Sequence, residues 1–136
     1  MNGSVQRDYI PKENAASPTV MNDSVMIQSC IDAHEERIVV TLDIPGAFLH
    51  ADLDEDVIML LRGQLADLMV QVDPELYGPY LRKTAKGESI LYVRMLKAMY
   101  GLLRSALLFY LKLVKDLTDY GFELNPYDPC VANKIV

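Results

Sequence analysis

Residues 37–50 read RIVVTLD-IPGAFLH, and this stretch decides the fold class. The first seven residues, 37–43, are rich in β-branched side chains and too short for a helix, which predicts a strand. The nearly continuous apolar run predicts that this strand is buried on both faces. Pro45 and Gly46 then end it. Asp43 is therefore expected at the end of a buried strand, beside a reversal of the chain.

Helical patterns flank this strand on both sides. Residues 22–36 begin with three N-cap candidates, Asn22, Asp23 and Ser24, and continue with an apolar stripe. Residues 103–119 give the strongest helical pattern, with Gly121 as its C-terminal stop. The apolar positions of this second helix are Leu103, Ala106, Leu107, Tyr110, Leu113, Val114 and Leu117. Strands and helices do not alternate as regular βαβ units, so the pattern favours an α+β fold.

The remaining segments predict shorter elements. The first half is expected to contain an extended segment at 1–20, a helical turn or acidic loop at 47–56, a strand at 57–61, and a helix at 63–72 with Leu65, Leu68, Met69 and Val72 on one side. The second half is expected to contain a polar loop at 84–89, a strand at 90–96 and, within 127–136, a last extended segment, CVANKIV.

Composition limits the class of protein. The 136 residues suffice for one domain, and 51% hydrophobic with 24% charged residues is typical of a globular chain. Cys30 and Cys130 lie too far apart for a metal-ligand motif, so a reducing, intracellular compartment is expected and each is expected to be a small core residue. No apolar run reaches the ~20 residues of a membrane span, and residues 1–14 lack the apolar core of a signal peptide, so no membrane partner is expected.

Charge is distributed unevenly. Residues 1–68 contain four Lys/Arg and twelve Asp/Glu, a net charge of −8, whereas residues 69–136 have a net charge of +2. Residues 82–115 contain eight Lys/Arg against Glu88 alone, a net charge of +7. This segment could contact phosphates, and the alternative is a solvated helix face with its flanking loops.

The acidic residues admit ordinary interpretations. Asp43 alone could be a turn or capping residue. The acidic run Asp52, Asp54, Glu55 and Asp56 lacks the spacing of a calcium loop and is expected to be a solvated face.

Four stretches of the sequence, taken together in their order along the chain, are more informative about function than any single residue. Residues 43–55, DIPGAFLHADLDE, place an aspartate before a turn and an Ala-Phe pair, and residues 97–102 read KAMYGL. Gln6, Asp8-Tyr9 and residues 17–20 precede them, and Gly121-Phe122 with residues 127–130 follow them. The series resembles the reverse transcriptases of copia-type retrotransposons over almost the whole chain.

The resemblance implies a fold and a reaction. Residues 1–136 would form part of a reverse transcriptase domain, spanning fingers and palm, with 1–20 as an extended fingers segment. A small antiparallel sheet would be backed by helices 22–36 and 103–119, with Asp43 at the end of the central strand. The family is an RNA-directed DNA polymerase that joins a primer 3′-hydroxyl to a deoxynucleotide on an RNA or DNA template, using two divalent ions.

The resemblance also implies roles for individual residues. Asp43 would be the catalytic ligand of Mg²⁺, with Mn²⁺ as an alternative ion. The backbone of Ile44, Pro45, Gly46 and Ala47 would lie beneath the triphosphate, Phe48 would exclude a ribose 2′-hydroxyl, and Tyr100 and Gly101 would shape the nucleotide pocket. In the cationic segment, Arg94, Lys97 and Arg104 are the expected nucleic-acid contacts.

The chain departs from the family at three places. The Val-Asp-Asp hairpin is absent, and the sequence stops at Val136, about where it would begin. The basic fingers residues before Gln6 are absent too, and residues 103–107 differ from the family's Lys-Gln-Ala-Pro-Arg. One carboxylate cannot hold two Mg²⁺ ions, so this chain alone is expected to be inactive. The alternative is a non-catalytic remnant that binds nucleic acid or another partner.

Overall fold

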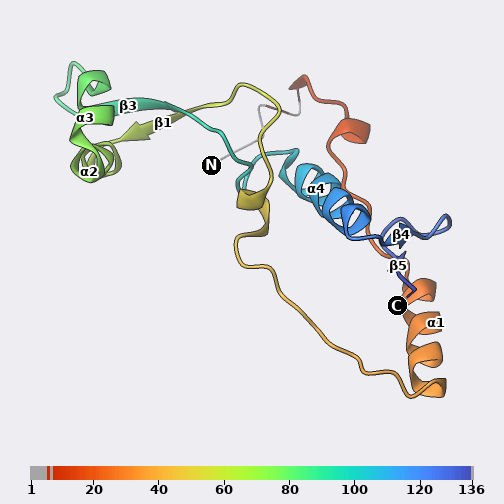
Figure 1. The fold of residues 1–136 in the computed structure, drawn as a ribbon. Helices are drawn as coiled ribbons and strands as arrows, with labels where there is room; N and C mark the ends of the chain where they lie inside the picture. Colours follow the sequence, from red (N-terminus) through yellow and green to blue (C-terminus); the bar gives the residue numbers. More distant parts are fainter. Residues whose placement is uncertain (1–5, 7, 136) are drawn as a thin grey trace. The chain divides into compact units, whose positions relative to one another are not determined.

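The computed structural model describes Gln6 and residues 8–135, and the chain divides into two compact units (Figure 1). We call residues 1–52 with 97–136 the split unit, and residues 53–96 the inserted unit. Both helices and strands are present, as the α+β prediction requires at this coarse level. Among the helices of the described part of the chain, none has the length and apolar character needed to cross a bilayer.

The inserted unit contains a three-stranded antiparallel sheet in the order β1-β3-β2. Its strands are β1 (Ile58–Arg62), β2 (Arg82–Lys83) and β3 (Ser89–Arg94). Leu60 pairs with Tyr92 between β1 and β3, and Lys83 pairs with Ser89 between β2 and β3. The polar turn at 84–88 closes the β2–β3 hairpin through a hydrogen bond from the Thr84 amide to the Glu88 carbonyl. The predicted strands at 57–61 and 90–96 are thereby confirmed.

Helix α2 (Gln64–Val72) packs on this sheet, and α3 (Pro74–Tyr77) and the 3₁₀ turn η4 (Gly78–Tyr80) follow it. The predicted helix at 63–72 is confirmed, but its buried face is not the predicted one. Ala66 is fully buried, whereas Leu65, Leu68 and Val72 are exposed. A small residue is buried there because it lets the helix approach the sheet closely.

The split unit contains the two long helices, α1 (Asn22–His34) and α4 (Ser105–Asp119). It also contains the 3₁₀ turns η2 (Lys12–Asn14) and η3 (Ala47–His50), and a short antiparallel ribbon of β4 (Glu123–Leu124) and β5 (Ala132–Asn133). Gly121 ends α4 with a φ of 85°, a left-handed conformation that glycine adopts without strain, as predicted. Both predicted helices are confirmed.

The predicted extended segment at 1–20 is interrupted by η2, and the part of that prediction on residues 1–5 and 7 lies outside the described residues. The helical turn expected within 47–56 is confirmed as η3. The extended end expected at 127–136 is confirmed only at β5, and residue 136 also lies outside the described residues.

The predicted buried strand at 37–43 is wrong. These residues have neither helix nor strand conformation, and Ile38 and Leu42 are 92% and 89% exposed. A strand requires a neighbouring strand for its backbone hydrogen bonds, and within the described residues none lies beside this segment. Asp43 consequently does not stand at the end of a central strand.

The predicted sheet backed by helices 22–36 and 103–119 has only partial support. The unit that contains both helices has only the β4–β5 ribbon among its described residues, and α4 contacts it. The three-stranded sheet lies in the inserted unit, where α2 packs on it.

The apolar stripes of the two long helices are less buried than their patterns predict. No residue of α1 is buried, and Cys30 is exposed, so its assignment as a core residue is wrong. In α4 the buried residues are Ser105 and Leu108, and Ala106 is exposed. The periodicity identified the helices, but the neighbouring elements decide which positions are covered.

Candidate nucleotide-binding site

The turn after Asp43 has the conformation that its sequence predicts. Gly46 has a φ of 62°, a left-handed conformation, and its carbonyl accepts a hydrogen bond from the Leu49 amide at 2.8 Å. This turn leads into η3, which carries Phe48 and His50. His50 Nε2 lies 3.2 Å from the Pro45 carbonyl, so the imidazole contacts the turn. Asp43, Ile44 and Pro45 are exposed.

The segment after η3 pairs with the KAMYGL segment. Asp52 and Lys97 form an antiparallel bridge, and the Ala98 amide donates to the Ala51 carbonyl at 2.9 Å. Ala51 and Ala98 are both buried, which lets the two backbones approach closely. The segments around Asp52 and Lys97 therefore lie side by side, although the two residues are 45 positions apart in the sequence.

An aromatic contact extends the same pairing. The rings of Phe48 and Tyr100 are 4.4 Å apart between centroids and tilted by 48°. Phe109 of α4 meets Phe48 edge-on at 6.4 Å. Such contacts stabilise by about 0.5–1.5 kcal/mol beyond the area that they bury. Tyr100 remains largely exposed despite this contact.

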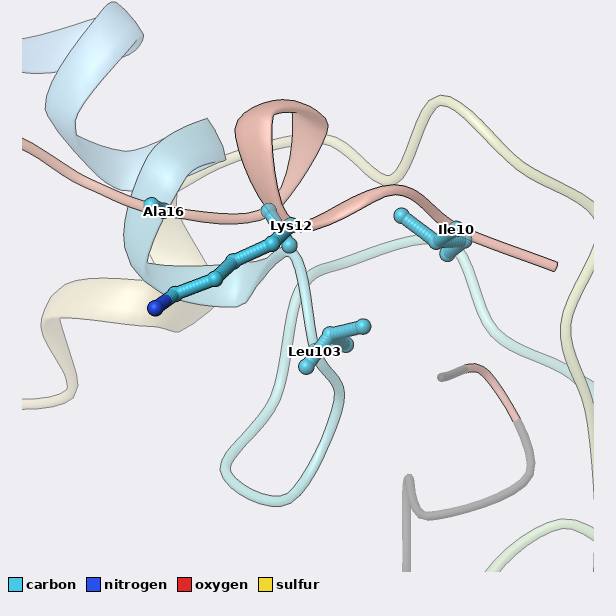
Figure 2. A pocket seen from close by; sticks show the side chains of 5 residues that line it. Ile10, Lys12, Ala16 and Leu103 are labelled. Carbon is cyan, nitrogen blue, oxygen red and sulfur yellow. The ribbon is translucent and has the colours of Figure 1, made fainter. Parts of the chain in front are cut away.

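The N-terminal stretch also reaches this region. The buried Gln6 side chain accepts a hydrogen bond from the Leu103 amide at 2.8 Å. Ile10, Lys12, Ala15, Ala16 and Leu103 line a pocket of about 450 Å³ (Figure 2). The pocket is lined by apolar side chains and one lysine, and the N-terminal stretch and the residue after KAMYGL form its walls.

Ser105 fixes the loop between Lys97 and α4. Its hydroxyl donates to the Met99 carbonyl at 2.6 Å and accepts from the Met99 amide at 3.1 Å. The side chain is 1% exposed, so both hydrogen bonds form away from water. This contact holds the loop that carries Tyr100 against the first turn of α4.

Asp128 links the C-terminal segment to the start of α1. One carboxylate oxygen accepts from the Met21 amide, and the other accepts from the Cys130 amide, both at 2.9 Å. The Ser24 hydroxyl and these two amides lower the pKa of Asp128, the Ser24 hydrogen bond contributing most. Helix α1 begins after Met21 without a side-chain cap, so none of the candidates Asn22, Asp23 and Ser24 is its N-cap. Asp128, 107 positions from Met21, instead contacts the Met21 amide and the Ser24 side chain at this end of the helix.

Burial affects two groups beside Asp128. It raises the pKa of the Cys130 thiol, and the nearby Asp128 charge raises it further. Burial also raises the pKa of Tyr110, whose hydroxyl donates to the Pro129 carbonyl at 3.0 Å. Cys130 is half-buried, close to the core position predicted for it.

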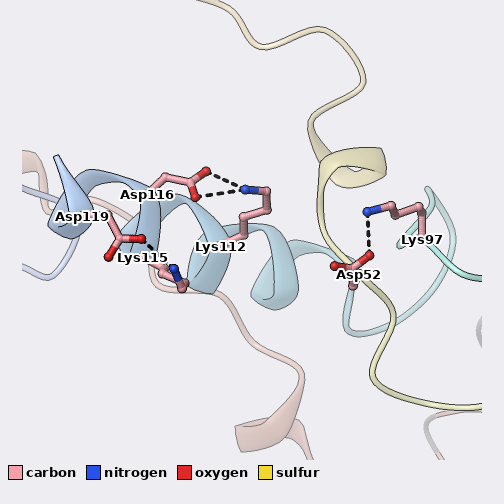
Figure 3. Close-up of polar contacts among 6 residues, drawn as sticks. All are labelled: Asp52, Lys97, Lys112, Lys115, Asp116 and Asp119. Atoms are coloured by element: carbon pink, nitrogen blue, oxygen red, sulfur yellow. Dashed lines mark hydrogen bonds and ion pairs between the residues drawn. The ribbon is translucent and has the colours of Figure 1, made fainter.

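The expected nucleic-acid contacts all have partners within the chain. Lys97 Nζ lies 2.6 Å from Asp52 (Figure 3), and this lysine lowers the pKa of the Asp52 carboxyl through its hydrogen bond and its charge. Arg94 pairs with Asp56 at 2.6 Å in the inserted unit. Arg104 donates to the Asn14 carbonyl at 3.1 Å.

Two other lysines of the cationic segment are paired along α4. Lys112 contacts Asp116 and Lys115 contacts Asp119, each four residues further along the helix (Figure 3). The Asp119 hydrogen bond raises the pKa of Lys115. The net charge of +7 over 82–115 is thus partly neutralised by carboxylates outside that segment.

The described residues do not by themselves fit a two-ion magnesium site. Asp43 offers one exposed carboxylate, and in the described part of the chain no group of three or more His, Cys, Asp or Glu side chains is placed to hold a metal ion. Mg²⁺ requires several oxygen ligands at near-octahedral positions.

Sequence reasoning missed Ser105 and Asp128 as positioning residues. A serine at the start of a helix and an Asp-Pro pair are signals of local capping. Neither signal identifies Met99 or Met21 as the partner, because those contacts depend on the tertiary fold.

Comparisons of this chain with protein-family models, with curated proteins and with solved structures found no match.

Proposed function

We propose that this chain is a fingers-and-palm segment of a copia-type RNA-directed DNA polymerase, inactive by itself. In the intact parent, the substrates would be deoxynucleoside triphosphates and an RNA or DNA template–primer, and Mg²⁺ or Mn²⁺ would be the ion. The order of the four sequence stretches is the first support for this proposal.

The contact between Phe48 and Tyr100 is the strongest structural support for this proposal. These residues come from two separate stretches that resemble polymerase motifs, and their rings meet at 4.4 Å. The backbone pairing of Ala51 with Ala98 supports the same neighbourhood, as does the hydrogen bond from Leu103 to Gln6. Two stretches that resemble polymerase motifs thus contact each other within the split unit, and the N-terminal stretch contacts Leu103, the residue that follows the second of them.

Each residue would have a distinct role in the parent enzyme. Phe48 would limit the room beside the sugar, and the exposed Tyr100 ring would contribute to the wall of the nucleotide pocket. Asp43 would supply one of several carboxylates. Because the backbone of 38–43 is unpaired within the described residues, positioning Asp43 would require further chain to pair with this segment.

The first test is the coding sequence after codon 136. We expect it to continue into a hairpin that contains two adjacent aspartates. A continuation without such a pair would contradict the polymerase proposal.

The second test is primer extension on poly(rA)/oligo(dT) with Mg²⁺. The 136-residue chain is expected to give no template-dependent incorporation, and the extended protein is expected to be active. In the extended protein, Asp43→Asn should abolish activity and Phe48→Ala should increase ribonucleotide incorporation. Asp67→Asn, at an exposed aspartate of α2, is the matched control. Full activity of the Asp43→Asn protein would overturn the role of Asp43.

The alternative function is nucleic-acid binding without catalysis. The cationic β2 strand, with Arg82 and Lys83 exposed, is the specific feature that favours it. A binding titration at several salt concentrations tests it, because phosphate contacts give a steep salt dependence. Absence of binding at low salt would exclude this alternative.

A further inference from the structure

Residues 37–43 form a largely apolar segment, and within the described residues only its first backbone amide, that of Arg37, is hydrogen bonded, to the Asp32 carbonyl at 2.9 Å. Ile38, Val39, Val40 and Leu42 are between 69% and 92% exposed. No hydrogen bond involves the backbone of residues 38–44 in the described part of the chain. Figure 1 draws this stretch as coil between α1 and η3. An exposed segment of this kind is a template for pairing with another strand.

The sequence of this segment suits a strand with two different faces. Side chains alternate between the faces of an extended chain. Ile38, Val40 and Leu42 would share one apolar face, and Arg37, Val39, Thr41 and Asp43 would share the other. β-branched residues favour the extended conformation, and Pro and Gly are absent until residue 45.

We propose that residues 37–43 pair antiparallel with the same residues of a second copy, centred on Val40. In this register Arg37 of each copy lies opposite Asp43 of the other, so two opposite-charge pairs form at the ends. Ile38 lies opposite Leu42, and Val40 lies opposite Val40 of the second copy. The segment is therefore self-complementary in both charge and apolar character.

The charges also select the direction of pairing. A parallel, in-register pair would place Arg37 beside Arg37 and Asp43 beside Asp43, and like charges directly opposite each other are destabilising. Within the chain, Arg37 contacts Glu35 at 2.6 Å and Asp32 at 3.7 Å. Half of the Arg37 side chain remains exposed, so these ion pairs can exchange with Asp43 of the second copy.

The expected association is weak and depends on concentration, because a two-stranded ribbon is only marginally stable in water. This inference does not rest on the polymerase proposal. Its tests measure association and not activity, so either proposal can fail without the other.

Sedimentation velocity over a concentration series is the first test. The wild-type chain should form dimers, and Arg37→Glu or Asp43→Lys should each weaken dimerisation by roughly tenfold. The double variant Arg37→Glu/Asp43→Lys should restore it, because the charge pairs are re-formed with opposite sign. A wild-type chain that stays monomeric, or a double variant no better than the single ones, would overturn the proposal.

Disulfide cross-linking tests the register. In a Cys30→Ser/Cys130→Ser background, Val40→Cys should give cross-linked dimers on mild oxidation, because directly opposite Cα atoms lie about 4.5–5.5 Å apart. Arg37→Cys should not, because its two copies would be six residues apart along the ribbon, about 20 Å. Equal cross-linking at both positions would indicate parallel pairing and contradict the proposed register.

Discussion

Two short segments of this chain have similar β-forming composition and opposite outcomes. Ser89–Arg94 is the central strand of the inserted unit, whereas 37–43 is exposed coil in the split unit. Leu91 in the first is fully buried, and Ile38 in the second is 92% exposed. The comparison teaches that β-branched composition favours the strand conformation, and that a strand forms only where a neighbouring strand is available for pairing.

The neighbours of β3 come from nearby sequence. β2 is joined to β3 by a tight turn, and β1 pairs with β3 over five residues on its other side. The segment 37–43 follows helix α1 and precedes a Pro-Gly turn, so no hairpin partner is adjacent in the sequence. Short connections make pairing inexpensive in chain entropy, and this segment lacks one.

Truncating the buried leucine of β3 should have the largest effect. Leu91→Ala should destabilise the inserted unit by about 2–5 kcal/mol, because it leaves a cavity between the sheet and α2. Val40→Ala, the matched change in the exposed segment, should lie within about 0.5 kcal/mol of wild type. Urea unfolding followed by circular dichroism at low protein concentration measures both. Equal losses would contradict the comparison.

Hydrogen exchange should separate the two segments directly. The β3 amides should exchange at least roughly 100-fold more slowly than those of residues 38–42, because only the former are hydrogen bonded. Mass spectrometry of peptides from each segment provides the measurement. If protection at 38–42 rises with protein concentration, the proposed pairing between two copies gains support.

Removing a buried hydroxyl should have an intermediate effect. Ser105→Ala leaves the backbone N–H of Met99 without its partner and removes one of two hydrogen bonds to the Met99 carbonyl, to which the Leu102 amide also donates. The loss should cost about 1–3 kcal/mol. Ser29→Ala removes an exposed hydroxyl from a helix and is the control. Thermal melting of the two variants compares them, and equal melting temperatures would show that the Met99 loop does not depend on Ser105.

Acid should weaken the link between Asp128 and α1. The pKa of Asp128 is lowered from its usual 3.8 by Ser24 and two backbone amides, so its contribution to stability is present above that value. It is lost as the pH falls through the lower, folded-state pKa. NMR shifts of the Met21 amide should follow this titration, and Asp128→Asn should remove it. A Met21 amide insensitive to pH in the wild-type protein would exclude the contact.

Cysteine reactivity should give the smallest contrast. Iodoacetamide should modify the exposed Cys30 faster than the half-buried Cys130, whose raised pKa keeps its thiol protonated near neutral pH. Mass spectrometry of timed samples gives the two rates, and urea should bring them together. Equal rates without urea would mean that the C-terminal segment is not packed as described.

The predicted site residues illustrate which contacts a sequence pattern can predict and which it cannot. The family resemblance placed Phe48 and Tyr100 in one nucleotide pocket; the two rings are in contact, and their role there stays a prediction. Lys97 was also predicted, as a nucleic-acid contact. Its pairing with Asp52 could not be predicted, because it depends on a bridge between segments that are distant in the sequence. The metal-binding role predicted for Asp43 stays a prediction, because this residue is exposed and in the described part of the chain no group of three or more His, Cys, Asp or Glu side chains is placed to hold a metal ion.

The sequence by itself determined the helices α1, α2 and α4, the β2–β3 turn and the left-handed stop at Gly121. These features depend on side chains within a few residues of one another, so the local pattern contains their cause. Only the tertiary structure decided that Asp128 contacts the Met21 amide at the start of α1, that Ser105 holds Met99 and that the backbone of 38–43 stays unpaired within the described residues. Each of these outcomes depends on whether a partner from elsewhere in the chain is within hydrogen-bonding distance, and periodicity and composition carry no information about that distance.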